Sequence, residues 1–135
     1  MIYLDSAAVV KLASAEPETP ALVAWLNARA RAQLIASALV ELEVPRALRR
    51  CAPAAIAAVP GILAMLYRFE INATVRAAAA SFPDAALRSL DAIHLATAHQ
   101  VADQIEAFVT YDVRLLGAAR RAGLPVASPG APAGA

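Results

Sequence analysis

A short apolar run that ends in an acidic residue, Met1-Ile2-Tyr3-Leu4-Asp5, opens the sequence, and the same pattern returns in Phe108-Val109-Thr110-Tyr111-Asp112. Each run has the length and the apolar character of a buried strand in a parallel sheet. The carboxyl ends of parallel strands meet at one edge of an open α/β sheet, where such folds bind their ligands. We therefore expect Asp5 and Asp112 to lie close together.

A third acid, Asp91, lies inside a helix-like and mainly apolar segment from Ser89 to Ala98. Burying a carboxylate among apolar side chains is costly unless a partner compensates it. From Ser89 to Val113 the chain has no Lys or Arg, so we do not expect a nearby cation as that partner. Converging Asp and Glu side chains with no cysteine nearby favour a hard divalent cation, Mg²⁺ or Mn²⁺.

The fourth candidate acid is Glu43, in a helix predicted over residues 37–51. Glu41 is the alternative, because two residues that are two apart on a helix point to nearly opposite sides and only one can join the site. Pro45 follows closely and is expected to kink this helix unless the helix begins only a few residues earlier.

Strand-like and helix-like segments alternate along the chain, which predicts a three-layer α/β/α domain with a mostly parallel central sheet. We expect the folded domain to cover residues 1–127 and residues 128–135 to form a flexible Pro/Gly/Ala tail. Ser6 is the expected N-cap of the first helix, and Pro60-Gly61 is expected to break a helical region. The remaining predicted strands are 34–36, 69–71 and an edge strand 125–127; the remaining predicted helices are 7–15, 20–31, 74–81 and 115–122.

The composition limits the class of protein. A chain of 135 residues has room for one ordinary domain. Its longest uncharged stretch, residues 52–67, is too short and too broken by proline and glycine to span a bilayer. No basic region precedes the first apolar run, so we expect no secretory signal and a cytoplasmic location. The single cysteine, Cys51, is compatible with a reducing compartment.

The charge distribution favours a polyanionic substrate. The net charge is only +1, but if the four candidate acids bind metal, 12 basic residues face the seven other acidic ones. An acidic pocket within a basic surface suits a ligand that is bound through metal and phosphate contacts. Arg46, Arg49 and Arg50 form a basic cluster after Glu43 that either grips such a ligand or complements the carboxyl end of its helix. A mixed, solvated surface is the alternative reading of the charges.

A series of short motifs covers almost the whole chain. They are Tyr3-Leu4-Asp5-Ser6, Ser37-Ala38-Leu39 with Glu43 and 46–50, Leu90-Asp91-Ala92-Ile93-His94, Val109-Thr110-Tyr111-Asp112 with Arg114-Leu115, Gly123-Leu124-Pro125-Val126 and Ser128-Pro129-Gly130. In these motifs and their order the chain resembles the PIN-domain ribonucleases, and specifically the VapC toxins of type II toxin–antitoxin pairs.

The resemblance implies a small α/β/α endoribonuclease that uses Mg²⁺ or Mn²⁺ held by Asp5, Glu43, Asp91 and Asp112. It further implies an RNA substrate, a cognate VapB-type antitoxin as regulator and a homodimer. Within this pattern Glu43 is favoured over Glu41. The basic cluster would then bind either RNA phosphates or acidic residues of the antitoxin.

Each candidate residue also has a purely structural interpretation. Asp5 and Asp112 are suited to cap the helices that follow them, and His94 shares a helix face with Asp91 either as a buried structural histidine or as a contact to substrate or to a metal ligand. Ser6 and Thr110 stand beside site acids and are suited to hydrogen-bond a carboxylate, water or phosphate, or simply to cap and pack.

Several other functions remain to be weighed. Aspartyl-phosphate phosphatases need a second Asp two positions after the first, where this chain has Ala7, and phospho-receiver domains need a late active-site Lys, whereas the only lysine is Lys11. A PIN-fold binding module, or a nuclease that cuts DNA or flap structures, stays open as an alternative. The sequence has no base-stacking series that would name a particular RNA.

Overall fold

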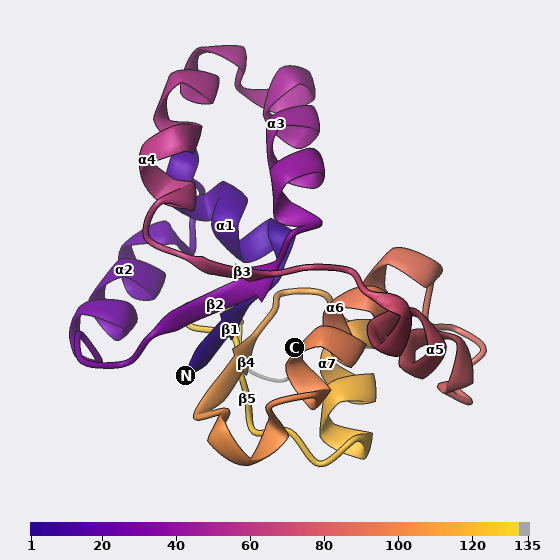
Figure 1. The fold of residues 1–135 in the computed structure, drawn as a ribbon. Coiled ribbons are helices and arrows are strands. Elements are labelled where there is room, and N and C mark those ends of the chain that lie inside the picture. Colours follow the sequence, from indigo (N-terminus) through magenta and orange to yellow (C-terminus); the bar gives the residue numbers. More distant parts are fainter. Residues whose placement is uncertain (133–135) are drawn as a thin grey trace.

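In the computed structural model, which describes residues 1–132, five parallel strands form one sheet with the order β3-β2-β1-β4-β5 (Figure 1). The amino-terminal strand is central, and all four strand pairs are parallel. This confirms the predicted α/β class. The elements are β1 (Ile2–Leu4), α1 (Ser6–Ala13), α2 (Thr19–Asn27), β2 (Leu34–Ser37), α3 (Val40–Cys51), η1 (Pro53–Ala58), α4 (Val59–Leu63), β3 (Tyr67–Phe69), α5 (Ala73–Ser81), α6 (Ser89–His99), η2 (Ala102–Gln104), β4 (Ala107–Val109), α7 (Val113–Arg121) and β5 (Val126–Ala127).

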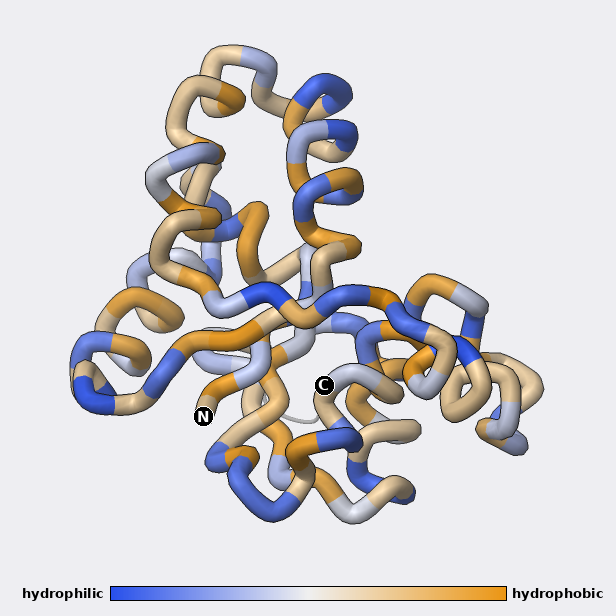
Figure 2. Tube along the Cα trace, viewed as in Figure 1, coloured by the Kyte–Doolittle hydropathy of each residue, from blue (hydrophilic) through white to orange (hydrophobic). Residues whose placement is uncertain are grey.

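Two hydrophobic cores lie on opposite faces of the sheet. Successive strand residues point to opposite faces, so Ile2 and Leu4 join one core while Tyr3 joins the other. The first core packs against α1, α2, α3 and α4, and the second against α6 and α7. The apolar strands therefore run through the middle of the molecule between two helical layers (Figure 2).

The register of the central strands positions the site. Leu4 is paired with Val109, and the backbone N–H of Asp5 donates to the carbonyl of Val109 at 3.3 Å. The residues that follow β1 and β4 therefore emerge at the same edge of the sheet. Helix α6 crosses this edge on one side, and α3 rises from it on the other (Figure 1).

Several expected element bounds are wrong in detail. The N-cap of α1 is Asp5, whose Oδ1 accepts from the backbone N–H of Ala8 at 2.9 Å, and not Ser6. Strand β3 lies two residues before the predicted 69–71, because the exposed Tyr67 begins it. Pro60 stands in the first turn of α4, where the missing N–H costs nothing, and does not break a helix.

Helix α3 begins at Val40, and Pro45 lies within its second turn without ending it. An apolar stripe of α3, with Val44 and Leu48 almost fully buried, packs against the first core. This packing fixes the rotation of α3 about its axis. Glu43 consequently faces the sheet edge.

The chain after β5 is held against the body of the domain as far as the structure describes it. The Ser128 hydroxyl donates to the Thr110 carbonyl at 2.6 Å, and the Tyr111 hydroxyl donates to the Pro129 carbonyl at 2.8 Å. Gly130 has φ +83° and lies so close to Ala21 that a Cβ would be 2.8 Å from the methyl group of that alanine. The end of the predicted tail, residues 133–135, falls outside the described residues.

Among residues 1–132 there is no helix with both the length and the apolar character needed to cross a membrane.

Candidate functional site

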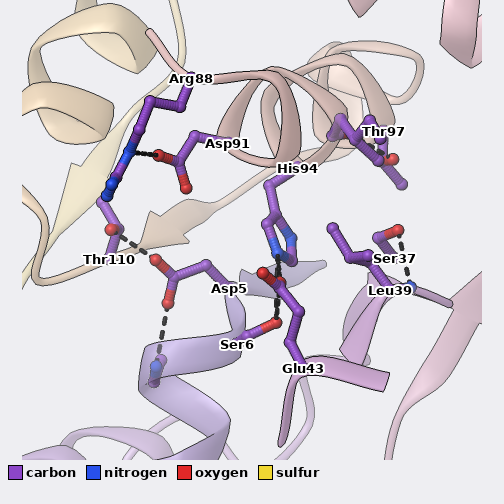
Figure 3. Close-up of polar contacts among 12 residues, drawn as sticks. Asp5, Ser6, Ser37, Leu39, Glu43, Arg88, Asp91, His94, Thr97 and Thr110 are labelled. Carbon is purple, nitrogen blue, oxygen red and sulfur yellow. Dashed lines mark hydrogen bonds and ion pairs between the residues drawn. The ribbon is translucent and has the colours of Figure 1, made fainter. Parts of the chain in front are cut away.

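The predicted acids come from four different elements that meet at the carboxyl edge of the sheet. Asp5 follows β1, Asp112 follows β4 and begins α7, Asp91 lies in the first turn of α6, and Glu43 lies on α3. Figure 3 shows Asp91 and His94 pointing from α6 towards the space occupied by Asp5 and Glu43.

Asp5 is the most deeply placed of the four acids, at 4% exposure. Its Oδ2 accepts a 2.6 Å hydrogen bond from the Thr110 hydroxyl, and its Oδ1 accepts from Ala8 N–H. Burial raises the pKa of Asp5, and these hydrogen bonds and His94 counteract the rise only in part, while the charge of Asp91 adds to it. A raised pKa means that the ionised form of Asp5 is disfavoured in the fold, and a bound cation would stabilise that form.

Asp91 is half-buried, and its pKa is also raised, first by burial and then by the charge of Asp112. Arg88 lies in the preceding turn, with its Nε 3.8 Å from Asp91 Oδ2. The expectation that no cation lies nearby was therefore wrong, since Arg88 stands one residue before the segment considered. The Arg88 side chain is 74% exposed, so its ion pair is screened by water and leaves the acid incompletely compensated.

Asp112 caps α7: its Oδ1 accepts from the backbone N–H groups of Arg114 and Leu115 at 2.8 and 3.1 Å. The Thr110 hydroxyl oxygen accepts from the Asp112 backbone N–H at 3.1 Å. The Thr110 hydroxyl thus contacts both strand-end acids: it bonds the carboxylate of Asp5 and the backbone N–H of Asp112.

Glu43 is held from two sides through the same oxygen. Its Oε1 accepts from the Ser6 hydroxyl at 2.6 Å and lies 2.8 Å from His94 Nε2. Burial raises the pKa of Glu43, but the hydrogen bonds with His94 and Ser6 outweigh burial, so the pKa lies below its usual value. Glu41, by contrast, points to β3 and forms an exposed ion pair with Arg68 at 3.5 Å.

His94 is buried at 2% exposure and connects Glu43 to the interior of the domain. Its Nδ1 lies 2.7 Å from the hydroxyl oxygen of Tyr3, which in turn accepts from the Ser37 backbone N–H at 3.1 Å. The sequence alone did not single out Tyr3. Its place one residue before the end of β1, next to Asp5, was the available signal.

An open hollow of about 550 Å³ is lined by Glu43 and by Ser6, which donates a hydrogen bond to Glu43. Arg46 and Arg50 line it from α3, and Arg88 lines it from the start of α6; Arg49 does not line it. Two exposed leucines, Leu42 and Leu90, complete its apolar rim. A concave basic surface next to acidic groups suits a phosphate-rich ligand whose bases or sugars contact the leucines.

The donor set fits a divalent cation. All four acids supply hard oxygen ligands, and in Asp91, Asp112 and Glu43 the protein contacts named above use one carboxylate oxygen and leave the other. Within residues 1–132, no three His, Cys, Asp or Glu side chains already stand close enough together to enclose a metal ion. The mutual effect of the acids on their pKa values nevertheless indicates uncompensated negative charge.

Comparison with known proteins gives a consistent result. The family model described as "PIN domain" matches residues 2–121. Ribonuclease VapC35 of Mycobacterium tuberculosis is 50% identical over 132 residues, which cover 96% of this chain and 98% of that protein. Ribonuclease VapC47 of the same species is 40% identical over 134 residues, covering 97% and 98%.

Two solved structures are similar in fold. The structure of FitAcB from Neisseria gonorrhoeae has a TM-score of 0.73 at 20% identity and covers 96% of this chain and 98% of that one. VapBC2 from Rickettsia felis, bound to a DNA fragment from its promoter, has a TM-score of 0.71 at 14% identity, with 96% and 99% coverage. At these identities the likeness concerns the fold.

Proposed function

The chain belongs to the PIN-domain family, within the VapC group, and on this basis we propose that it is an endoribonuclease that uses Mg²⁺ or Mn²⁺ at Asp5, Glu43, Asp91 and Asp112. The observation that carries the proposal is the placement of four acids around one sheet edge, two of them with raised pKa values. Ionised carboxylates that are partly buried are costly unless a cation compensates them. A divalent metal bound there would supply an activated water and a Lewis acid for phosphodiester hydrolysis.

The protein's own residues have distinct tasks in this proposal. Thr110 holds Asp5 and the backbone of Asp112, and Ser6 and His94 hold Glu43. Asp91 faces the same space from α6. Fixing these carboxylates before the substrate arrives removes the need to reorganise them during the reaction.

Substrate binding is assigned to the basic hollow beside Glu43. Arg46, Arg50 and Arg88 would contact the phosphates on one side of the cleaved bond. These contacts carry no base specificity, and the choice of RNA would come from single-stranded bases placed against the exposed leucines.

We further propose that a VapB-type antitoxin regulates the enzyme and that the enzyme is a homodimer. Both assignments rest on membership of the VapC group. Co-expression with the gene that neighbours this one, followed by copurification and sedimentation analysis, tests both. An antitoxin is expected to bind stoichiometrically and to stop RNA cleavage.

The decisive experiment is cleavage of total cellular RNA by the purified protein, free of antitoxin, with Mg²⁺ or Mn²⁺. We expect discrete fragments that disappear with EDTA and with Asp91→Asn. Cleavage that persists in EDTA would contradict metal dependence. A folded protein that binds Mn²⁺ but cuts only DNA, or cuts nothing, would support the alternatives of a DNA nuclease or a binding module.

A further inference from the structure

A continuous hydrogen-bonded path runs from the centre of the sheet to Glu43. It begins at the backbone N–H of Ser37 on β2, passes through the Tyr3 hydroxyl and the imidazole of His94, and ends at Glu43 Oε1. The ring of Tyr3 is fully buried and stacks on Phe108, with centroids 4.9 Å apart and planes within 2°. The path therefore starts from a rigid part of the core.

The contacts show how the ring of His94 is held. The Tyr3 oxygen accepts from Ser37 N–H and lies 2.7 Å from His94 Nδ1, so one ring nitrogen is tied to the core. The other ring nitrogen, Nε2, lies 2.8 Å from Glu43 Oε1. A carboxylate oxygen only accepts hydrogen bonds, so this contact requires a proton on Nε2.

The path also determines which oxygen of Glu43 is available. Ser6 and His94 both bond Oε1, whereas no hydrogen bond reaches Oε2 among the described residues. A free glutamate side chain has several rotatable bonds, and ordering it costs conformational entropy. Two donors on one oxygen, from two different helices, order the side chain before any ligand binds.

We propose that Tyr3 and His94 are positioning residues: the Tyr3 hydroxyl holds the ring of His94 through Nδ1, and the Nε2–H of His94 holds Glu43 by Oε1 with Oε2 directed to the ligand. The part of the inference that concerns Oε2 rests on the proposed metal site. The position of the His94 ring and the order of Glu43 are properties of the metal-free protein and do not depend on it.

The chain is well suited to a direct test, because it contains only two histidines, and the other, His99, is exposed at the end of α6. With ¹⁵N-labelled histidine, NMR of the metal-free protein reports whether a ring nitrogen carries a proton that is held in a hydrogen bond. We expect the Nε2 proton of His94 to be observed and protected from exchange with water, and the ring protons of the exposed His99 to exchange. A His94 Nε2 without a proton would overturn the proposal.

Tyr3→Phe removes the hydroxyl and keeps the ring that stacks on Phe108. We expect this variant to lose the protection of the His94 Nε2 proton and to bind Mn²⁺ about 10- to 100-fold more weakly, as is usual when a partner of a metal ligand is removed. Tyr67→Phe, at an exposed tyrosine on β3, is the matched control and should change neither property. An unchanged His94 spectrum in Tyr3→Phe would refute the role of the hydroxyl.

Substitution of His94 distinguishes positioning from simple packing. His94→Gln keeps an N–H donor that reaches the position of Nε2, whereas His94→Leu fills the space without a donor. We expect Gln to retain most of the Mn²⁺ affinity and Leu to lose it by about 10-fold or more. Equal losses in both variants would refute positioning. If wild type shows the protected Nε2 proton of His94 but binds no Mn²⁺, the proposed metal site fails while the positioning of Glu43 stands.

Discussion

Thr110 and Asp5 are joined across neighbouring strands by a 2.6 Å hydrogen bond from the threonine hydroxyl to the buried carboxylate. The same hydroxyl oxygen receives the Asp112 backbone N–H. The side chain of Thr110, the residue after β4, therefore sets the relative position of Asp5 and Asp112, which are 107 residues apart in sequence.

Thr110→Val tests this relationship because valine keeps the shape and removes the hydroxyl. We expect a loss of about 1–3 kcal/mol in the free energy of unfolding, because Asp5 Oδ2 is left buried and unpaired. Chemical denaturation measures this loss. Thr74→Val, at an exposed threonine in the first turn of α5, is the control and should cost clearly less.

Asp91→Asn is expected to stabilise the metal-free protein, because it removes a charge that is uncompensated in the fold. The melting temperature should rise by about 3 °C, which for a domain of this size corresponds to about 1 kcal/mol. Excess Mn²⁺ at about 100 times its dissociation constant should stabilise wild type by about 2.7 kcal/mol. The variant should gain far less. Lower stability of metal-free Asp91→Asn, with no effect on Mn²⁺ binding, would remove Asp91 from the site.

The free energy of unfolding of wild type and that of Asp91→Asn should depend differently on pH, because folding shifts the pKa of Asp91 upwards. Because the pKa of Asp91 is raised on folding, the folded state binds the proton more tightly than the unfolded state. The free energy of unfolding of wild type therefore falls as pH rises from about 3.9, the unfolded value, through the raised folded pKa. The advantage of Asp91→Asn should appear across this interval and level off above it. Asp103→Asn, at an exposed acid in η2, is the control.

Glu43→Gln and Glu41→Gln separate the two candidate glutamates. Glu43 contacts Ser6 and His94, whereas Glu41 pairs with Arg68 at the surface. We expect RNA cleavage to fall by about 100-fold or more in Glu43→Gln, a loss typical of removing one preorganised charged group. Glu41→Gln should stay within about twofold of wild type, since exposed ion pairs contribute little. The reverse order of effects would transfer the role to Glu41.

The three arginines of the predicted basic cluster should differ in effect. Arg46 and Arg50 line the hollow beside Glu43, and Arg49 does not. Arg46→Ala and Arg50→Ala should each raise KM for RNA several-fold and reduce the slope of log affinity against log salt by about one. Arg49→Ala should leave the slope closer to that of wild type. Equal slopes in all three variants would show that the hollow is not the phosphate site.

Much of the fold could be predicted because its signals are local. The apolar runs that end at Asp5 and Asp112 are continuous, as buried parallel strands are, and the acids after them mark where both strands end. Strand β3 was placed two residues too late because its first residue, Tyr67, is exposed and carries no burial pattern. The cap of α1 was assigned to Ser6 because the sequence does not show whether the strand ends before or after Asp5.

The candidate site could be predicted only in part, for a different reason. The spacing of Glu41 and Glu43 shows that they face opposite sides, but only the rotation of α3 on the core decides which one meets His94. The contact of Tyr3 with His94 joins residues 91 positions apart. Such contacts depend on how α6 lies on the sheet, which no local pattern encodes. The ion pair of Arg88 with Asp91 was not predicted, because Arg88 lies one residue before the apolar segment that contains Asp91.

The central place of β1 in the sheet has a consequence for biosynthesis. Asp5 leaves the ribosome first, but the strand that brings Asp112 beside it is encoded near the end of the chain. Until β4 has emerged, β1 lacks a neighbour on one side and the proposed metal cage lacks a wall. We therefore expect a nascent chain that lacks β4 and Asp112 to be inactive as a nuclease while it is still on the ribosome. Ribosome-bound chains stalled before residue 107 should leave RNA intact where released, full-length protein cuts it.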